Sequence, residues 1–271
     1  MIENGLTRRS LSLGLPLSVG LFHLATDAMA AESGGAKETG GSPVKPKVAM
    51  LVYNDMILLD LTGPMTVLAL AMSDVQLVAK SRNPVRTDIG VLVQPTITFD
   101  ECPSDLDVIF VPGGLVGSIA AMEDEAILAF LADRGSRAKW VTSVCTGALV
   151  LGAAGLLRGY KATSHWYVRD YLSLMGAEVS EDRVVMDRNR ITAGGVTAGI
   201  DFGLYLAAKM RGEDYAKRIQ LILEYDPKPP FSAGSPHTAE PELVRDVLER
   251  RAKLLDQAKA AAANAGSRSP K

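Results

Sequence analysis

A cysteine marks the point where a strand-like run of residues gives way to a helix-like run. Cys145 follows WVTSV, which is rich in β-branched residues, and precedes TGALVLGAAGLL, whose small and aliphatic residues are typical of a packed helix. A strand–turn–helix elbow lifts such a side chain above the edge of the sheet. The helix start also directs free N–H groups at the sulfur, which favours the nucleophilic thiolate. We interpret Cys145 as a reactive thiol; the alternative is a buried, inert cysteine, which is how we interpret Cys102.

Nucleophilic attack builds negative charge on a substrate, so hydrogen-bond donors should lie near the thiol. The segment VPGGLVG places Gly113 and Gly114 after the end of an apolar strand. We expect the N–H of Gly114 and the N–H of Thr146 to bind one substrate atom between them, as an oxyanion and substrate-binding site. The alternative is an ordinary glycine turn.

An acid or a base is also needed, and two side chains are candidates. Asp60 stands among apolar residues in ILLDL, and a carboxylate in such a place is rarely buried without a partner. We expect it to face the thiol; the alternative is an acid that binds the N–H groups of a helix start. His165 is a candidate accessory base, although neither H-x-E nor H-x-D is present to orient its ring. A structural, hydrogen-bonded histidine is the alternative there.

Apolar strands alternate with helices along most of the chain. Strand patterns cover residues 47–53, 75–80, 106–111, 139–144 and 160–165, helices are expected to begin near Thr62 as an N-cap and to cover residues 166–176, and a hairpin is expected at Asp187–Asn189. This alternation predicts an α/β fold with a mostly parallel sheet and helices on both faces. Active sites of such sheets lie at the carboxyl ends of strands. The loop after Val111 and the elbow at Cys145 both qualify.

The chain divides into four segments by composition. Residues 1–30 contain Arg8 and Arg9, an apolar stretch and the small-x-small sequence Ala28-Met29-Ala30, which together predict a twin-arginine export signal. Residues 31–46 read as a flexible linker, residues 47–236 as the folded domain, and residues 237–271 as a C-terminal helix and tail. We therefore expect a periplasmic or exported protein, with a cytoplasmic protein as the alternative. The apolar stretch is too short for a membrane span, so no stable membrane association is expected after signal removal.

Composition argues against several classes of protein. The formal net charge is -2 and no long basic stretch occurs, so we expect no nucleic-acid partner. Two cysteines are too few for a disulfide framework. No CxxC pair or cysteine–histidine cluster indicates a zinc site, so we expect no metal.

Five segments of the chain resemble the ThiJ/PfpI superfamily, and within it the isonitrile hydratase branch. They are LLDLTGP, DVIFVPGG, VTSVCTGALVLGAAGLLRGYKATSHW, GGVTAGIDFGLYLAA and LEYDPKPPFSAGSP. The resemblance implies a flavodoxin-like α/β sandwich of the class I glutamine amidotransferase-like type, a homodimer, and no cofactor. It places the acid, the nucleophile and the neighbouring threonine of the branch on Asp60, Cys145 and Thr146. The implied reaction adds water to a small-molecule isonitrile, R–N≡C, and gives an N-substituted formamide through a cysteine thioimidate.

Two other functions stay open at the level of the sequence. One is a different cysteine-dependent activity of the superfamily: glyoxalase-like, peptidase-like, or a stress or repair protein. The other is a non-catalytic ligand-sensing module of the kind that precedes AraC-type DNA-binding domains. Only about 35 residues follow Pro236, too few for a paired helix-turn-helix unit.

Overall fold

A seven-stranded sheet lies at the centre of this computed structural model, which describes residues 44–268. Its strands, in spatial order, are β10 (Val184–Asp187), β11 (Arg190–Ala193), β7 (Trp140–Val144), β6 (Val108–Val111), β1 (Lys47–Leu51), β2 (Asp74–Ala79) and β5 (Ile97–Thr98). All neighbours are parallel except β10 and β11, which form the predicted hairpin. Two small pairs lie outside it, β3 (Val85–Arg86) with β4 (Leu92–Val93) and β8 (Lys161–Ala162) with β9 (Glu178–Val179). The predicted export signal lies outside the described residues, as does most of the predicted linker.

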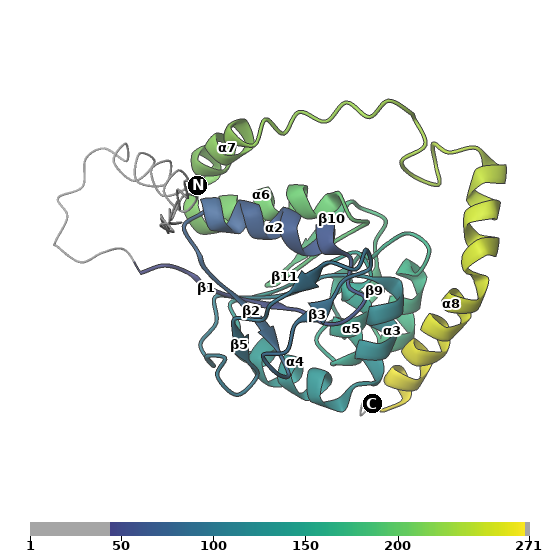
Figure 1. Ribbon diagram of the computed structural model, residues 1–271. Helices are drawn as coiled ribbons and strands as arrows, with labels where there is room; N and C mark the ends of the chain where they lie inside the picture. Colours follow the sequence, from purple (N-terminus) through teal and green to yellow (C-terminus); the bar gives the residue numbers. More distant parts are fainter. Residues whose placement is uncertain (1–43, 269–271) are drawn as a thin grey trace, which may run out of the picture. The chain divides into compact units, whose positions relative to one another are not determined.

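Helices cover both faces of this sheet (Figure 1). They are α2 (Leu58–Leu70), α3 (Leu115–Glu123), α4 (Glu125–Arg137), α5 (Gly147–Ala153), the 3-10 helix η1 (Arg169–Met175), α6 (Ala198–Arg211), α7 (Glu213–Ile222) and α8 (Pro241–Arg268). In Figure 1, α2 and α6 lie on one side of the sheet, and α3, α4 and α5 lie on the other. Strands β6 and β7 are buried along nearly their whole length, as expected for parallel strands covered on both faces. The predicted flavodoxin-like sandwich is confirmed.

Helix α2 begins four residues before the N-cap that the sequence predicted at Thr62. The N–H of Leu58 donates to Asp88 Oδ1 at 3.0 Å, so a loop from elsewhere in the chain caps the helix. Thr62 lies inside the helix, and its hydroxyl donates to the Leu58 carbonyl at 3.1 Å. The prediction failed because the cap is supplied by a residue distant in the sequence. As a consequence, Asp60 lies in the first turn of α2 rather than before it.

The segment that follows β8 also differs from its prediction. Only Lys161 and Ala162 are extended, and they pair with β9 instead of joining the central sheet. The helix predicted over residues 166–176 is the 3-10 helix η1, which ends as expected at Gly176, with a φ of 83°. Residues 163–168 therefore belong to no element. The Ser164 hydroxyl donates to the Cys145 carbonyl at 2.8 Å, which holds this loop against the predicted elbow.

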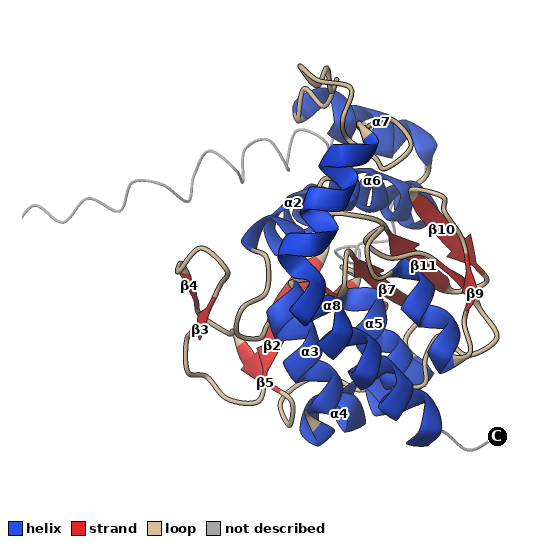
Figure 2. Cartoon of the chain, turned by 90° about the vertical axis from the view of Figure 1, so that its right-hand side faces the viewer, coloured by secondary structure: helices blue, strands red, loops and turns tan. Residues whose placement is uncertain are grey.

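The C-terminal helix α8 packs against the rest of the domain. Its contacts are with η1, α3 and α5, and Figure 2 shows it crossing in front of α3 and α5. The residues that it buries are one leucine and four alanines: Leu255, Ala258, Ala261, Ala262 and Ala265. Such small side chains allow close helix–helix contact. Within residues 44–268, no helix is both long enough and apolar enough to cross a bilayer.

Candidate active site

Cys145 occupies a strained backbone position between β7 and α5. Its φ is 57°, in the left-handed region that non-glycine residues rarely adopt. The Cys145 N–H holds this conformation by donating to the carbonyls of Ala193 at 3.0 Å and Gly194 at 2.7 Å. Gly147 completes the turn, because a Cβ there would lie 2.3 Å from the Val111 carbonyl oxygen. The chain thus forms the elbow that the sequence predicted.

Asp60 meets the elbow at Gly113. The Gly113 N–H donates to Asp60 Oδ2 at 2.9 Å, and both Asp60 and Cys145 are fully buried. A Cβ on Gly113 would lie 2.6 Å from Asp60 Oδ2 and 2.6 Å from Cys145 Cβ. The other carboxyl oxygen, Oδ1, is buried and has no hydrogen-bond partner within the described part of the chain. A charged carboxylate is costly in such a position, so the neutral acid is favoured.

The carboxyl and the thiol affect each other's titration. Burial raises the pKa of Asp60 from 3.8 to about 7, against the lowering effects of the Cys145 thiol and the Gly113 N–H. Burial, and then the charge of Asp60, raise the pKa of Cys145 well above its ordinary value, although the Thr146 N–H opposes them. Burial thus outweighs the helix start, which the sequence analysis expected to favour the thiolate. Above pH 7 the pair holds one proton between its two groups.

Thr146 belongs to a buried hydrogen-bond network behind the elbow. Its Oγ1 accepts from the Gly114 N–H at 2.8 Å and lies 2.8 Å from Ser118 Oγ. Ser118 Oγ lies 3.2 Å from the Tyr53 hydroxyl, which donates to the Pro112 carbonyl at 2.6 Å. Tyr53 and Ser118 are 65 residues apart and carry no motif, so nothing in the sequence predicted their part in the site. The network fixes the glycine loop against the elbow.

The two glycine N–H groups bind side chains of the site in this structure. That of Gly113 is directed at Asp60 and that of Gly114 at Thr146. The expected pairing of the Gly114 N–H with the Thr146 N–H around a substrate atom would therefore require the Gly114 N–H to leave the Thr146 hydroxyl. The Thr146 N–H already faces the sulfur, where it lowers the pKa of Cys145.

His165 lies beside the elbow but packs against aromatic rings. Its ring centroid is 3.7 Å from that of Tyr167, and its buried Nδ1 has no hydrogen-bond partner among residues 44–268. Burial, and then the charge of Arg251, lower the pKa of His165 to about 4. Burial raises the pKa of Tyr167, and the charges of Cys145 and Asp60 add to that rise. The charges of the reactive pair therefore reach Tyr167, which carries no sequence motif, as they reach Tyr53.

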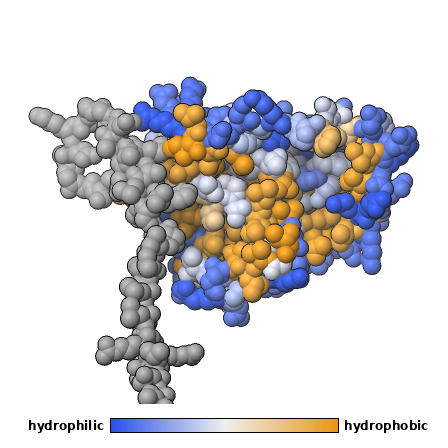
Figure 3. Space-filling view, turned by 45° about the horizontal axis from the view of Figure 1, so that its top comes forward, coloured by the Kyte–Doolittle hydropathy of each residue, from blue (hydrophilic) through white to orange (hydrophobic). Residues whose placement is uncertain are grey.

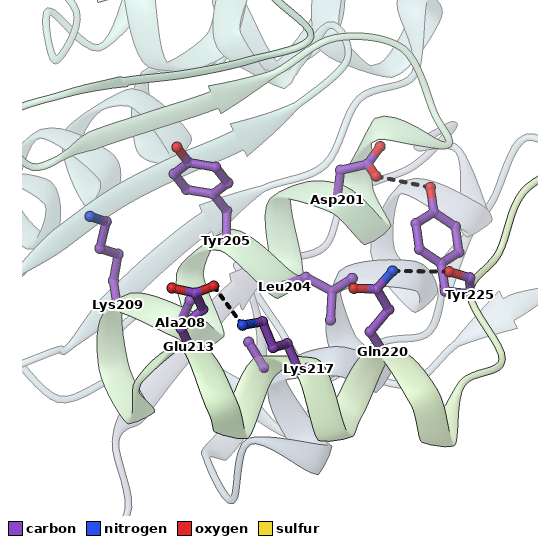
Figure 4. Close-up of a pocket in the computed structure, with 10 residues that line it drawn as sticks. Asp201, Leu204, Tyr205, Ala208, Lys209, Glu213, Lys217, Gln220 and Tyr225 are labelled. Carbon is purple, nitrogen blue, oxygen red and sulfur yellow. Dashed lines mark hydrogen bonds and ion pairs between the residues drawn. The ribbon is translucent and has the colours of Figure 1, made fainter.

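The thiol is closed off from the cavities of this structure. Cys145 and Asp60 line none of five well-formed cavities in the described residues. A cavity of about 640 Å³ lies between α6 and α7 (Figure 4), where Tyr225 donates to Asp201 at 3.0 Å and Lys217 pairs with Glu213 at 2.8 Å. Four of its polar side chains are thus paired with each other, and no cysteine, serine, threonine or histidine lines it. A second cavity, of about 240 Å³, is lined by His165 and Tyr167. No group of three or more metal-ligating side chains occurs in residues 44–268.

Gly113→Ala is expected to lower kcat/KM by about a hundredfold, because small displacements of reacting groups have effects of that size. The new Cβ would lie 2.6 Å from Asp60 Oδ2 and 2.7 Å from the Thr146 nitrogen, so the carboxyl and the elbow must separate. Gly63→Ala on α2 is the matched control, since its Cβ would meet Ile200 at an ordinary 3.4 Å. Circular dichroism checks that both variants fold. Normal activity in Gly113→Ala would show that contact between the carboxyl and the elbow is dispensable.

Comparisons with known proteins bear on this site. Residues 46–209 match the model of the DJ-1/PfpI family. An isonitrile hydratase from Pseudomonas putida is 50% identical over 211 residues, which are 77% of this chain and 91% of that protein. The crystal structure of a ThiJ/PfpI family protein from Pseudomonas syringae, 48% identical, superposes with a TM-score of 0.79 over 86% of this chain and 99% of that one. Oxidized DJ-1 from Toxoplasma gondii, 24% identical, shares the fold with a TM-score of 0.61 over 67% of this chain and 100% of that one.

Proposed function

The chain belongs to the DJ-1/PfpI family, and from that premise we propose that it is an isonitrile hydratase, a lyase that adds water to R–N≡C to give an N-substituted formamide. The observation that carries the proposal is the buried Asp60 carboxyl, whose pKa is raised to about 7, placed against Cys145 at Gly113. Identity of 50% with the Pseudomonas putida isonitrile hydratase supports the choice of reaction. An acid that keeps its proton near neutral pH is what this chemistry needs, because the isonitrile carbon must be protonated before it accepts a nucleophile.

The proposed reaction proceeds in two steps. Asp60 gives its proton to the isonitrile carbon while the Cys145 thiolate forms a C–S bond to that carbon, and the product is a thioimidate, R–N=CH–S. Water then adds to the thioimidate carbon, the C–S bond breaks, and R–NH–CHO leaves. One proton of that water goes to the nitrogen and the other returns to the Asp60–Cys145 pair. The N–H and the hydroxyl of Thr146 lower the pKa of Cys145 and so stabilise the sulfur anion that leaves.

The position of His165 disfavours the peptidase-like alternative. A cysteine peptidase or glutaminase needs a histidine that is oriented by a third group and bonded to the thiol. Here the His165 Nδ1 has no partner within residues 44–268, and the ring packs on Tyr167. Burial and the charge of Arg251 keep the pKa of this histidine near 4, so it is neutral at physiological pH. An acid–thiol pair without a catalytic histidine suits the hydratase reaction.

The direct test is hydration of a simple aryl isonitrile. The purified full-length protein is incubated with phenyl isonitrile, and N-phenylformamide is measured by liquid chromatography against a protein-free reaction. We expect formamide to form catalytically, with many turnovers for each molecule of protein. If correctly folded protein gives no formamide above the uncatalysed rate with any aryl or alkyl isonitrile, the proposal is wrong.

The rate of hydration is expected to rise with pH through about 7 and then to level off. Below that pH the pair holds two protons, because the folded pKa of Asp60 is about 7 and that of Cys145 is far higher, so no thiolate is present. Loss of the first proton leaves one proton in the pair, and transfer of that proton from the sulfur to Asp60 gives the acid and the thiolate that react. The expected slope of kcat/KM below pH 7 is about tenfold per pH unit. The measurement covers pH 5 to 9 with the uncatalysed rate subtracted, and a fall between pH 6 and 8 would contradict the one-proton mechanism.

A homodimer is part of the proposal, as the family resemblance implies. Exposed apolar side chains are what a second copy would cover, and several lie on the side of the domain that carries α2, α6 and α7. They are Leu59 (47% exposed), Tyr205 (50%), Leu221 (82%) and Ile222 (50%). Figure 3 shows apolar surface among polar surface with this side turned toward the viewer. Such exposure on one side of a domain is typical of a protein interface.

Export is also part of the proposal, with a cytoplasmic location as its alternative. The twin arginine at residues 8 and 9 supports it. An oxidising compartment threatens exposed thiolates, but the side chain of Cys145 is fully buried and its pKa is raised by that burial. A thiol in this state oxidises slowly, so the site is compatible with either compartment.

A further inference from the structure

A cavity of about 240 Å³ is lined by His165 and Tyr167, which closely follow the residue that hydrogen-bonds to the elbow, Ser164. It is bounded by the loop that follows β8, by the loop before α8 and by the first half of α8. Its walls are mostly apolar, and they comprise His165, Trp166, Tyr167, Val244, Val247 and Arg251, among others. A cavity of about 150 Å³ holds a benzene ring. This one therefore has room for a ring-sized group that also carries a polar substituent.

One short loop contacts the elbow and also forms part of the cavity wall. The Ser164 hydroxyl donates to the Cys145 carbonyl at 2.8 Å, and Tyr167, three residues later, lines the cavity. Burial and the charges of Cys145 and Asp60 raise the pKa of Tyr167, whereas Arg251 lowers it. Residues 164–167 therefore link the elbow to the wall of this cavity.

Arg251 gives the cavity a positive charge that no neighbouring acid neutralises. No aspartate or glutamate is among the residues that line the cavity. Arg251 forms no ion pair with any residue of the range 44–268, whereas the adjacent Arg250 pairs with Asp246 at 2.7 Å. Two further polar groups belong to the same wall: the Tyr167 hydroxyl, which hydrogen-bonds to Arg251, and His165 Nδ1, which has no hydrogen-bond partner within residues 44–268. This combination of a guanidinium and polar groups is suited to binding a carboxylate of a ligand.

We propose that this cavity holds the substituent of the isonitrile and that Arg251 selects substituents carrying a carboxylate. The inference rests on the proposed hydratase function and names the substrate class for that site. A mostly apolar cavity with a few convergent polar groups binds an organic acid by burying its carbon skeleton and pairing its charge. Arg251 lies on α8, beyond the residues that match the family model, so its position can differ between relatives that share the catalytic pair.

The test compares 4-isocyanobenzoate with its neutral isostere 4-isocyanobenzamide. Wild-type protein is expected to have a kcat/KM for the carboxylate about three- to tenfold above that for the amide, the range that a partly exposed ion pair supplies. The difference should lie in KM and shrink as salt is added. Arg251→Gln is expected to bring the ratio to about one, and Arg251→Lys to restore part of it. Arg250→Gln is the matched control, and its ratio of kcat/KM for the carboxylate to kcat/KM for the amide should equal that of the wild type.

The possible results separate this inference from the proposed function. If neither compound is hydrated, the proposed function fails and the substrate class fails with it. If both are hydrated with equal kcat/KM, the function stands and the substrate class is wrong. A carboxylate preference that persists in Arg251→Gln also overturns the assignment, because the charge must then come from another residue. Circular dichroism spectra of the three variants establish that the ratios refer to folded protein.

Discussion

Cys145→Ala is expected to abolish isonitrile hydration, with a loss in kcat on the order of a thousandfold or more, as is found when a covalent nucleophile is removed. The variant keeps Asp60 and the oriented Thr146 N–H, but it has no atom that can form the thioimidate. The methyl group of alanine fits the space of the thiol, so the elbow itself should remain. Formamide production from phenyl isonitrile measures the effect.

Cys102→Ala is the control for this experiment. Cys102 is also buried, at 3% exposure, and burial also raises its pKa. Its carbonyl accepts a hydrogen bond from Arg134, which holds the loop after β5 against α4. Cys102 takes part in none of the hydrogen bonds described for Asp60, Thr146 and Gly113, so its replacement should leave hydration intact. Substantial turnover by Cys145→Ala would mean that Asp60 activates water directly and that no covalent intermediate forms.

The sequence predicted those parts of the site that depend on neighbouring residues. The elbow at Cys145 follows from a strand pattern, a cysteine and a small-residue helix in direct succession. The approach of Asp60 to the thiol follows from strand topology, because β1 and β7 flank β6 and the loops after all three open at one edge. The local residue pattern was sufficient to predict the elbow, and the parallel order of the strands was sufficient to predict that Asp60 approaches it.

Other features depend on residues that are distant in the sequence, and the pattern could not predict them. The start of α2 is set by Asp88, which lies 30 residues beyond the helix N–H that it accepts. The high pKa of Cys145 depends on its complete burial in the folded chain, and this burial outweighs the short helix whose start was expected to favour the thiolate. The position of Arg251 depends on how α8 packs on η1, α3 and α5. Each of these is a tertiary contact between segments with no shared motif.

Asp60→Asn is expected to lower kcat by about a hundred- to ten-thousandfold, which is the contribution of a positioned general acid. The amide can still accept from the Gly113 N–H, so the geometry of the site is retained, but it has no proton to give to the isonitrile carbon. Activity should not recover at any pH, because an amide does not titrate in this range. Formamide assays from pH 5 to 9 test this. A rate close to that of the wild type would remove Asp60 from the role of acid while leaving Cys145 as nucleophile.

The same substitution should make the protein more stable at alkaline pH. The folded pKa of Asp60 is about 7 against 3.8 in the unfolded chain, so between these values the folded state binds more protons and stability falls as pH rises. The neutral acid's contribution is fully present below pH 4 and is lost above 7, at a cost of up to about 4 kcal/mol for a shift of this size. Asparagine carries no such cost. The melting temperature of Asp60→Asn relative to wild type should therefore rise by several degrees between pH 5 and pH 8.

An exposed aspartate provides the control that ties this pH dependence of stability to the burial of Asp60. Asp100→Asn changes an exposed carboxyl in a turn, and its melting temperature relative to wild type should be the same at pH 5 and pH 8. If Asp60→Asn behaves like Asp100→Asn, then Asp60 ionises in the folded protein as easily as in the unfolded chain. The carboxyl would in that case hold no proton at neutral pH, and a different group would have to protonate the isonitrile. If Asp60 is a buried acid that serves catalysis and not folding, Asp60→Asn must both lose activity and gain stability at alkaline pH.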